Sequence, residues 1–131
     1  MSVGVLIISH DGIGPALLGT ATLMLNDCPL QTKLLTVSRD CDPDQLTEDA
    51  VEQIEALDAG EGVLVLTDLY GSTPCNIARK LISKKHVHVV SGLNLSMLIR
   101  VFNYPKLTLE ELSEKAVSGG KDGISKTVAE S

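Results

Sequence analysis

The chain has 131 residues, of which 44% are hydrophobic and 2% aromatic, and its formal net charge is −6. A chain of this size and apolar content can bury a core, so we expect residues 1–131 to form one domain. The acidic balance and the scarcity of aromatic rings argue against nucleic-acid binding. No apolar run reaches the length of a membrane span and no secretion-signal pattern is present, so we expect a cytoplasmic protein.

Cysteine and histidine spacing favours neither a disulfide framework nor a metal site. Cys28, Cys41 and Cys75 are odd in number and show no C-x-x-C spacing, so we interpret them as reduced thiols. His86 and His88 alternate on one predicted strand, but no carboxylate or cysteine lies at a suitable local spacing. We therefore expect no metal and no cofactor.

Four short runs rich in Val, Leu and Ile alternate with helical patterns. The runs cover 3–8, 33–37, 62–67 and 86–91, and each is typical of a buried strand. Helix-start signals follow each run: Gly14-Pro15; Asp42-Pro43, with Gln45 placed to complete a capping box; Ser72-Thr73-Pro74; and Asn94, followed later by a capping box from Thr108 to Glu111.

This alternation predicts a three-layer α/β fold with a mainly parallel open sheet. We expect the strand order 2-1-3-4, which places the first strand beside the third. Residues 121–131 do not fit the alternation, and Ile124 and Val128 are their only strongly apolar members. They form either a frayed tail or an antiparallel strand exchanged between two subunits.

His10 and Asp68 each follow a buried strand, the first and the third. If those strands are neighbours, the two side chains meet at the sheet edge where α/β proteins place their sites. A carboxylate that accepts a hydrogen bond from one imidazole nitrogen leaves the other as a nucleophile. His10 is thus the candidate nucleophile and Asp68 its orienting partner, whereas Asp11 is worse placed because adjacent side chains diverge.

The loop after Asp68 offers groups that could hold a phosphoryl product. Gly71, Ser72 and Thr73 lead into a helix, whose free N–H groups and dipole stabilise a dianion, and Gly12 precedes a second helix start beside His10. Taken singly, Thr73 is most simply a helix N-cap and His10 a strand-end residue. These residues by themselves therefore favour a catalytic role and a purely structural role equally.

Three segments together resemble the mannose-family IIA domains of the bacterial sugar phosphotransferase system. They are Ile8-Ser9-His10, then Asp68-Leu69-Tyr70-Gly71-Ser72-Thr73-Pro74-Cys75-Asn76, and Ser91-Gly92-Leu93-Asn94-Leu95-Ser96-Met97-Leu98. The resemblance implies a phosphotransferase component: His10 accepts a phosphoryl group from the carrier HPr and passes it to a IIB domain. It further implies that Asp68 orients the ring, that Thr73 touches the phosphate, and that a homodimer exchanges its C-terminal strands.

Three positions depart from the family pattern. Asp11 stands where a small residue is usual, Ser72 replaces a common glycine, and Ser96 replaces the usual proline. The negative charge of Asp11 lies near the expected phosphoryl group and could slow transfer or change the choice of partner. No linker or IIB domain follows, so delivery is expected to a separate chain, with the membrane reached only through the IIC and IID transporter components.

Two other functions remain open at this stage. One is a regulatory module whose binding to a protein partner is switched by phosphorylation of His10, without a role in transport. The other is a small hydrolase that uses His10 with Ser72, although the G-x-S-x-G elbow of such enzymes is missing. The sugar cannot be read from the sequence, because in this scheme a IIA domain never touches it.

Overall fold

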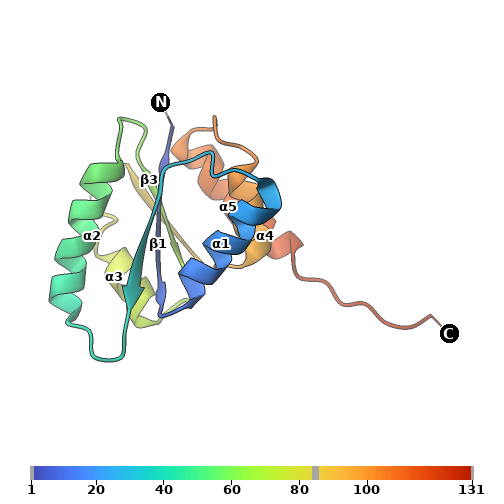
Figure 1. The fold of residues 1–131 in the computed structure, drawn as a ribbon, viewed down its shortest axis with the longest axis horizontal. Helices are drawn as coiled ribbons and strands as arrows, with labels where there is room; N and C mark the ends of the chain where they lie inside the picture. Colours follow the sequence, from blue (N-terminus) through green and yellow to red (C-terminus); the bar gives the residue numbers. More distant parts are fainter. Residues whose placement is uncertain (1, 84–85, 131) are drawn as a thin grey trace.

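The structure, a computed structural model, describes residues 2–83 and 86–130 as a parallel sheet between two layers of helices (Figure 1). The strands are β1 (Gly4–His10), β2 (Thr32–Val37), β3 (Val63–Thr67) and β4 (Val87–Ser91). The helices are α1 (Ile13–Leu25), α2 (Pro43–Leu57), α3 (Thr73–Arg79), α4 (Leu95–Phe102) and α5 (Leu109–Asp122). The expected alternation is therefore confirmed, with two helices after β4.

The sheet has the order β2-β1-β3-β4, and every pair of neighbouring strands is parallel. This confirms the predicted order and brings β1 beside β3. The register pairs His10 with Val37, so β1 and β2 end level with each other, and it pairs Ile8 with Thr67, so β3 ends two residues earlier. Residues that follow these three strands consequently meet at one edge of the sheet.

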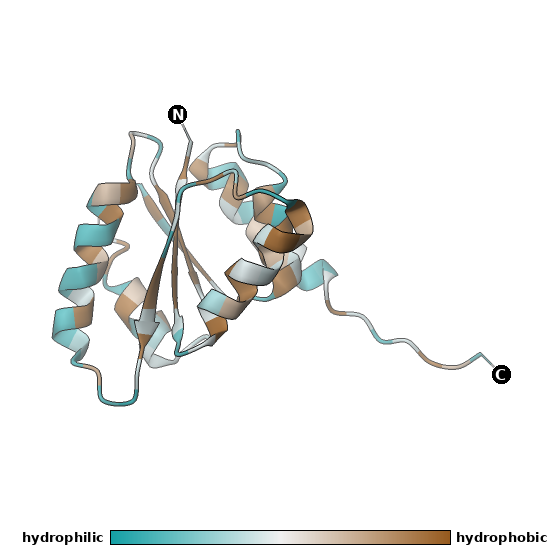
Figure 2. Cartoon of the chain, in the orientation of Figure 1, coloured by the Kyte–Doolittle hydropathy of each residue, from teal (hydrophilic) through white to brown (hydrophobic). Residues whose placement is uncertain are grey.

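Both faces of the sheet are covered, because successive side chains of a strand point to opposite sides. Ile7 and Leu66 belong to the apolar cluster that includes residues of α1, α4 and α5. Leu6 and Val65 belong to the cluster on the opposite face, with residues of α2 and α3. Figure 2 shows these strands as hydrophobic along their length, and this double burial explains the unbroken apolar runs of the sequence.

Helix starts follow the expected chemistry in α4 and α5 and depart from it in α2 and in α3, where Ser72 is the N-cap and makes no side-chain cap hydrogen bond. Thr108 and Glu111 form the predicted capping box of α5, and Asn94 caps α4 by accepting from the backbone N–H of Met97. The capping box predicted at Gln45 is wrong. Asp42 does cap α2, but the Gln45 amide instead donates to a carboxylate oxygen of Asp49 at 3.0 Å, one helical turn further on.

The C-terminal segment begins later than the sequence suggested. α5 continues through Lys121 and Asp122, so these two residues are helical and do not belong to a tail or a strand. Residues 124–130 form no strand with the described chain, and they extend away from the body of the molecule (Figure 1). Exchange of this segment between subunits therefore stays a prediction. Within the described ranges, no helix combines the length and apolar character needed to cross a bilayer.

Candidate active site

His10 and Asp68 form a close pair at the edge where β1 and β3 end. The His10 ring nitrogen Nδ1 lies 2.8 Å from Oδ2 of Asp68, and the His10 backbone N–H donates to the same oxygen at 3.0 Å. The Asp68 side chain is only 6% exposed, whereas that of His10 is 44% exposed. One buried carboxylate oxygen thus holds both the backbone and the ring of a histidine that remains open to partners.

The electrostatics of the pair define which ring nitrogen can react. Burial raises the pKa of the Asp68 carboxyl, but the hydrogen bonds and the positive charge supplied by His10 outweigh it and hold that pKa below its ordinary value. An ionised carboxylate only accepts hydrogen bonds, so Nδ1 carries the proton of the neutral ring. Nε2 then carries the free lone pair, which is the arrangement of an oriented nucleophile.

The second oxygen of Asp68 differs from the first. Oδ1 is buried and has no hydrogen-bond partner among the described residues. The interactions of this carboxylate with other groups are therefore concentrated on His10, and a change at either residue is felt directly by the other. The two residues are 58 positions apart in the chain, and the sheet order alone brings them together.

The start of α1 beside His10 is built from three small residues. Gly12 is the N-cap and has a φ of 84°, a left-handed conformation that favours glycine. Ser9 Oγ accepts from the Gly14 N–H at 2.9 Å, and it donates to the His10 carbonyl at 3.0 Å. The Gly14 N–H is therefore already satisfied, and Pro15 has no N–H at all. This helix start offers a phosphoryl group fewer donors than its sequence suggested.

The β3–α3 loop places Thr73 at the site and turns Ser72 away from it. Gly71 has a φ of 82°, and Ser72 rather than Thr73 is the N-cap of α3. The Ser72 hydroxyl donates to the Leu69 carbonyl at 2.6 Å. It does not point at His10 in this structure, so the predicted roles of Ser72, as a phosphate ligand or as a hydrolase nucleophile, would both require it to turn.

A cleft of about 440 Å³ opens beside His10. It is lined by His10, Asp11, Val37, Ser38, Arg39, Cys41 and Thr73. Sequence reasoning expected His10 and Thr73 here, but it missed Ser38 and Arg39. A signal for them was available, because they directly follow the end of β2 just as Asp68 directly follows the end of β3.

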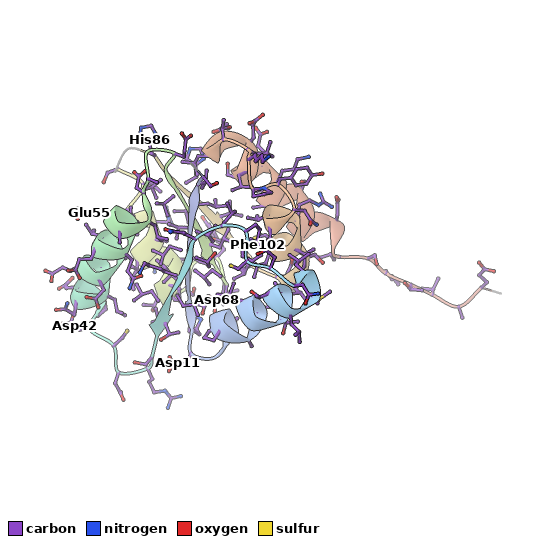
Figure 3. All side chains as sticks on the ribbon, turned by 45° about the horizontal axis from the view of Figure 1, so that its top comes forward. Asp11, Asp42, Glu55, Asp68, His86 and Phe102 are labelled. Atoms are coloured by element: carbon purple, nitrogen blue, oxygen red, sulfur yellow. The ribbon has the colours of Figure 1, made fainter. Side chains whose placement is uncertain are left out.

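Asp11 also lines this cleft, so the position flagged as a departure from the family pattern lies within the site. Figure 3 shows Asp11 and Asp68 toward the same end of the sheet. The two acidic side chains have different surroundings: Asp68 is held by His10, whereas Asp11 is exposed. Two acidic side chains with different surroundings therefore lie near the His10 ring.

Among the described residues, the other histidines and the cysteines do not gather into a metal centre. His86 precedes β4 with a φ of 63°, so the expectation that His86 and His88 alternate on one strand is wrong. His88 Nδ1 lies 3.1 Å from Ser113 Oγ and 3.7 Å from Glu110 Oε2. All three cysteines are free. In the described part of the chain, no group of three or more His, Cys, Asp or Glu side chains could hold a metal ion.

The chain is similar to known proteins over most of its length. The family model described as "PTS system fructose IIA component" matches residues 4–117. The PTS system mannose-specific EIIAB component of Escherichia coli (strain K12) is 29% identical over 131 residues, which cover 95% of this chain and 39% of that protein. The chain thus spans about two fifths of the length of this curated relative.

Solved structures show the same fold. The mannose/sorbose specific IIA subunit of the phosphotransferase system from Enterococcus faecalis has a TM-score of 0.86 at 22% identity, covering 100% of this chain and 98% of that one. A sigma-54 interaction domain protein from Enterococcus faecalis has a TM-score of 0.77 at 16% identity, covering 93% of each chain. The family model matches most of the chain and confirms the resemblance carried by its motifs, so the chain belongs to the mannose-type IIA family of the bacterial sugar phosphotransferase system.

Proposed function

We propose that this chain is a phosphoryl carrier that accepts a phosphoryl group from phospho-HPr on Nε2 of His10 and passes it to a IIB domain. The observation that carries the proposal is the 2.8 Å contact of His10 Nδ1 with Asp68, which in the neutral ring leaves the lone pair on Nε2, and the ring is 44% exposed. In this role the protein acts in the cytoplasm during sugar uptake, and it reaches the membrane only through the IIC and IID components.

The bonds that form and break in the transfer step involve only the phosphoryl group and two imidazole rings. The Nε2 lone pair of His10 attacks the phosphorus of phosphohistidine on HPr, so that one N–P bond forms while the other breaks. The HPr ring leaves with the electron pair of its N–P bond. As His10 loses its lone pair, its ring becomes more positive, and the ionised carboxylate of Asp68 stabilises that charge more strongly than it stabilises the neutral ring. Transfer to a IIB domain is the same step in reverse.

Four residues are proposed to surround the bound phosphoryl group. Thr73 supports this proposal most directly, because it lines the cleft beside His10. Gly12 and Gly71 adopt left-handed conformations, with φ of 84° and 82°, where the chain turns into α1 and α3. Ser72 takes part only if its hydroxyl leaves the Leu69 carbonyl. Replacing Thr73 by valine keeps the side-chain shape and removes the hydroxyl, so it tests the first of these contacts.

The phosphoryl acceptor can be identified by radiolabelling. We expect enzyme I, HPr and labelled phosphoenolpyruvate to label the wild-type chain and to leave His10→Ala unlabelled. His86→Asn is the matched control, because asparagine tolerates the positive φ of 63° at that exposed position. Label on His10→Ala, or none on the wild type, would overturn the proposal.

The acceptor distinguishes transport from regulation. The labelled chain is mixed with a mannose-type IIB domain, and loss of label from His10 with its gain on IIB is the expected result. A chain that labels at His10 but never discharges to IIB supports the alternative, a regulatory module whose binding to a protein partner changes with phosphorylation. In that case, affinity for the partner must differ between the labelled and unlabelled forms.

We also propose that two copies form a homodimer by exchanging residues 124–130. Ile124 is 77% exposed and Val128 is 67% exposed, so these two large apolar side chains are left uncovered in the single chain. β4 ends the sheet with an unpaired edge, and a groove of about 650 Å³ lies between it and α5. Val89 and Val117 give this groove apolar walls. A strand from a second copy would pair the free edge and bury both apolar side chains.

Sedimentation tests the exchange. Because Gly119 and Gly120 are buried in α5, the informative truncation ends at Gly123 rather than within the helix. We expect the full chain to sediment as a dimer and both the truncated chain and Val128→Lys to sediment as monomers. Thr127→Lys is the matched control, because neighbouring residues of a strand face opposite sides. A monomeric full chain, or a truncated chain that remains dimeric, would show that these residues do not hold two copies together.

A further inference from the structure

One positively charged residue lines the cleft beside His10. Among the described residues that line it, Arg39 is the cation and Asp11 the exposed anion. Arg39 is exposed and makes no ion pair with the described residues. The guanidinium of this cleft-lining residue is therefore not committed to an ion pair with the described residues.

The sheet register explains why this arginine reaches the site. His10 of β1 pairs directly with Val37, the last residue of β2. Ser38 and Arg39 come directly after Val37, and Asp11 comes directly after His10. The segments that leave β2 and β1 therefore lie next to each other at this edge of the sheet. The cleft has these two segments as walls, with Thr73 of α3 completing it.

A phosphoryl group bound in the cleft would need a nearby positive charge. A phosphoryl group on Nε2 would bring a charge of about −1.5 to −2 near neutral pH. It would meet Asp11 in the same cleft and Asp68 behind the ring, in a chain whose net charge is already −6. The start of α1 cannot supply full compensation, because the Gly14 N–H is bonded to Ser9 and the next residue is a proline.

We propose that Arg39 is a phosphoryl-binding residue of this site, and that its guanidinium offsets the negative charge of Asp11 when His10 carries a phosphoryl group. A guanidinium can donate two parallel hydrogen bonds to phosphoryl oxygens, which an ammonium group cannot match in geometry. The proposal rests on the proposed function, because it requires His10 to be the phosphoryl acceptor. It assigns a role to Asp11 as well: this residue makes the transfer dependent on Arg39.

The first experiment avoids any protein partner. Phosphoramidate transfers its phosphoryl group to histidine, with ammonia leaving as the P–N bond breaks, and intact-mass measurement follows the product on His10. We expect Arg39→Gln to lower the rate about tenfold, which corresponds to about 1.4 kcal/mol, and Arg39→Lys to fall between it and the wild type. Arg79→Gln is the matched control, because it removes the same charge from an exposed arginine at the end of α3, outside the cleft.

Coupling to Asp11 gives a second readout that a purely structural role of Arg39 would not produce. Asp11→Asn should raise the rate in the wild-type background, and it should recover most of the rate lost in Arg39→Gln. An Arg39→Gln rate within twofold of wild type would overturn the inference. So would an equal loss in Arg79→Gln, because the effect would then come from net charge.

Parallel labelling by phospho-HPr separates this inference from the proposed function. If HPr fails to label the wild type while phosphoramidate labels it in a way that depends on Arg39, the carrier role fails and the assignment of Arg39 stands. If both donors label wild type and Arg39→Gln at equal rates, the carrier role stands and the assignment fails. If neither donor labels His10, both fail.

Discussion

Replacing Asp68 by asparagine tests the mechanism most directly. The Asp68 carboxylate oxygen Oδ2 holds His10 through contacts of 2.8 Å to Nδ1 and 3.0 Å to the backbone N–H. Asparagine keeps the size and one acceptor oxygen, but it loses the negative charge. A hydrogen bond to a charged group contributes about 1.5–3 kcal/mol, and its loss lowers a rate by about 10- to 150-fold. The loss falls mainly on the transfer step, because the positive charge on the ring grows as Nε2 forms its bond to phosphorus.

The assay for Asp68→Asn is the initial rate of labelling by phospho-HPr. We expect at least a tenfold loss, with circular dichroism unchanged. A second measurement uses the ring nitrogen signals of His10 in NMR spectra: the wild type should show Nδ1 protonated, whereas the amide of asparagine should allow both tautomers. Asp122→Asn is the control, because it removes an exposed carboxylate that pairs with Arg100. A folded Asp68→Asn chain labelled within twofold of the wild-type rate would refute the assignment of Asp68.

Three further predictions concern stability. Gly14→Ala should destabilise the fold by about 1–3 kcal/mol in urea unfolding and slow labelling, because its Cβ would lie 2.7 Å from Ser9 Oγ; unchanged stability would contradict the close approach. Thr108→Ala should lower the free energy of unfolding by about 1 kcal/mol, because α5 loses its N-cap, while the rate of labelling stays normal. Slower labelling would show that α5 is coupled to the site. Because the folded-state pKa of Asp68 is lowered, its ionised form stabilises the fold above the ordinary carboxyl pKa, and this contribution is lost as pH falls through the lowered value. The stability difference between wild type and Asp68→Asn should therefore shrink on acidification, and a difference that is constant from neutral to acid pH would contradict the assigned direction.

The pairing of His10 with Asp68 could be predicted from the sequence, because it depends only on where the two parallel strands end. Each residue follows an apolar run, and parallel strands present their carboxyl ends at one edge. The pair could be anticipated once β1 and β3 were taken as neighbours, as the observed order confirms. Arg39 follows β2 by the same geometry, yet its place became clear only from the cleft, since a charged residue in an exposed loop looks like ordinary surface.

Hydrogen-bond partners were less predictable than positions. Gln45 stood at the spacing of a capping box, but Asp49 offered its amide a carboxylate one turn away. Ser72 looked like a donor to the site, but its hydroxyl found the Leu69 carbonyl. In both cases the polar group bonded to a neighbour in the chain other than the partner that its spacing suggested, because short polar side chains can bond to several nearby groups.

The sequence by itself determined the elements of this protein and their class. Buried parallel strands demand apolar runs, helix starts demand particular residues, and both are short-range requirements that can be read along the chain. The tertiary structure alone decided which oxygen of Asp68 holds His10, that the Gly14 N–H is already satisfied, and that Asp11 and Arg39 share one cleft. These depend on register and on the meeting of segments far apart in sequence, where a shift of one residue would change every contact.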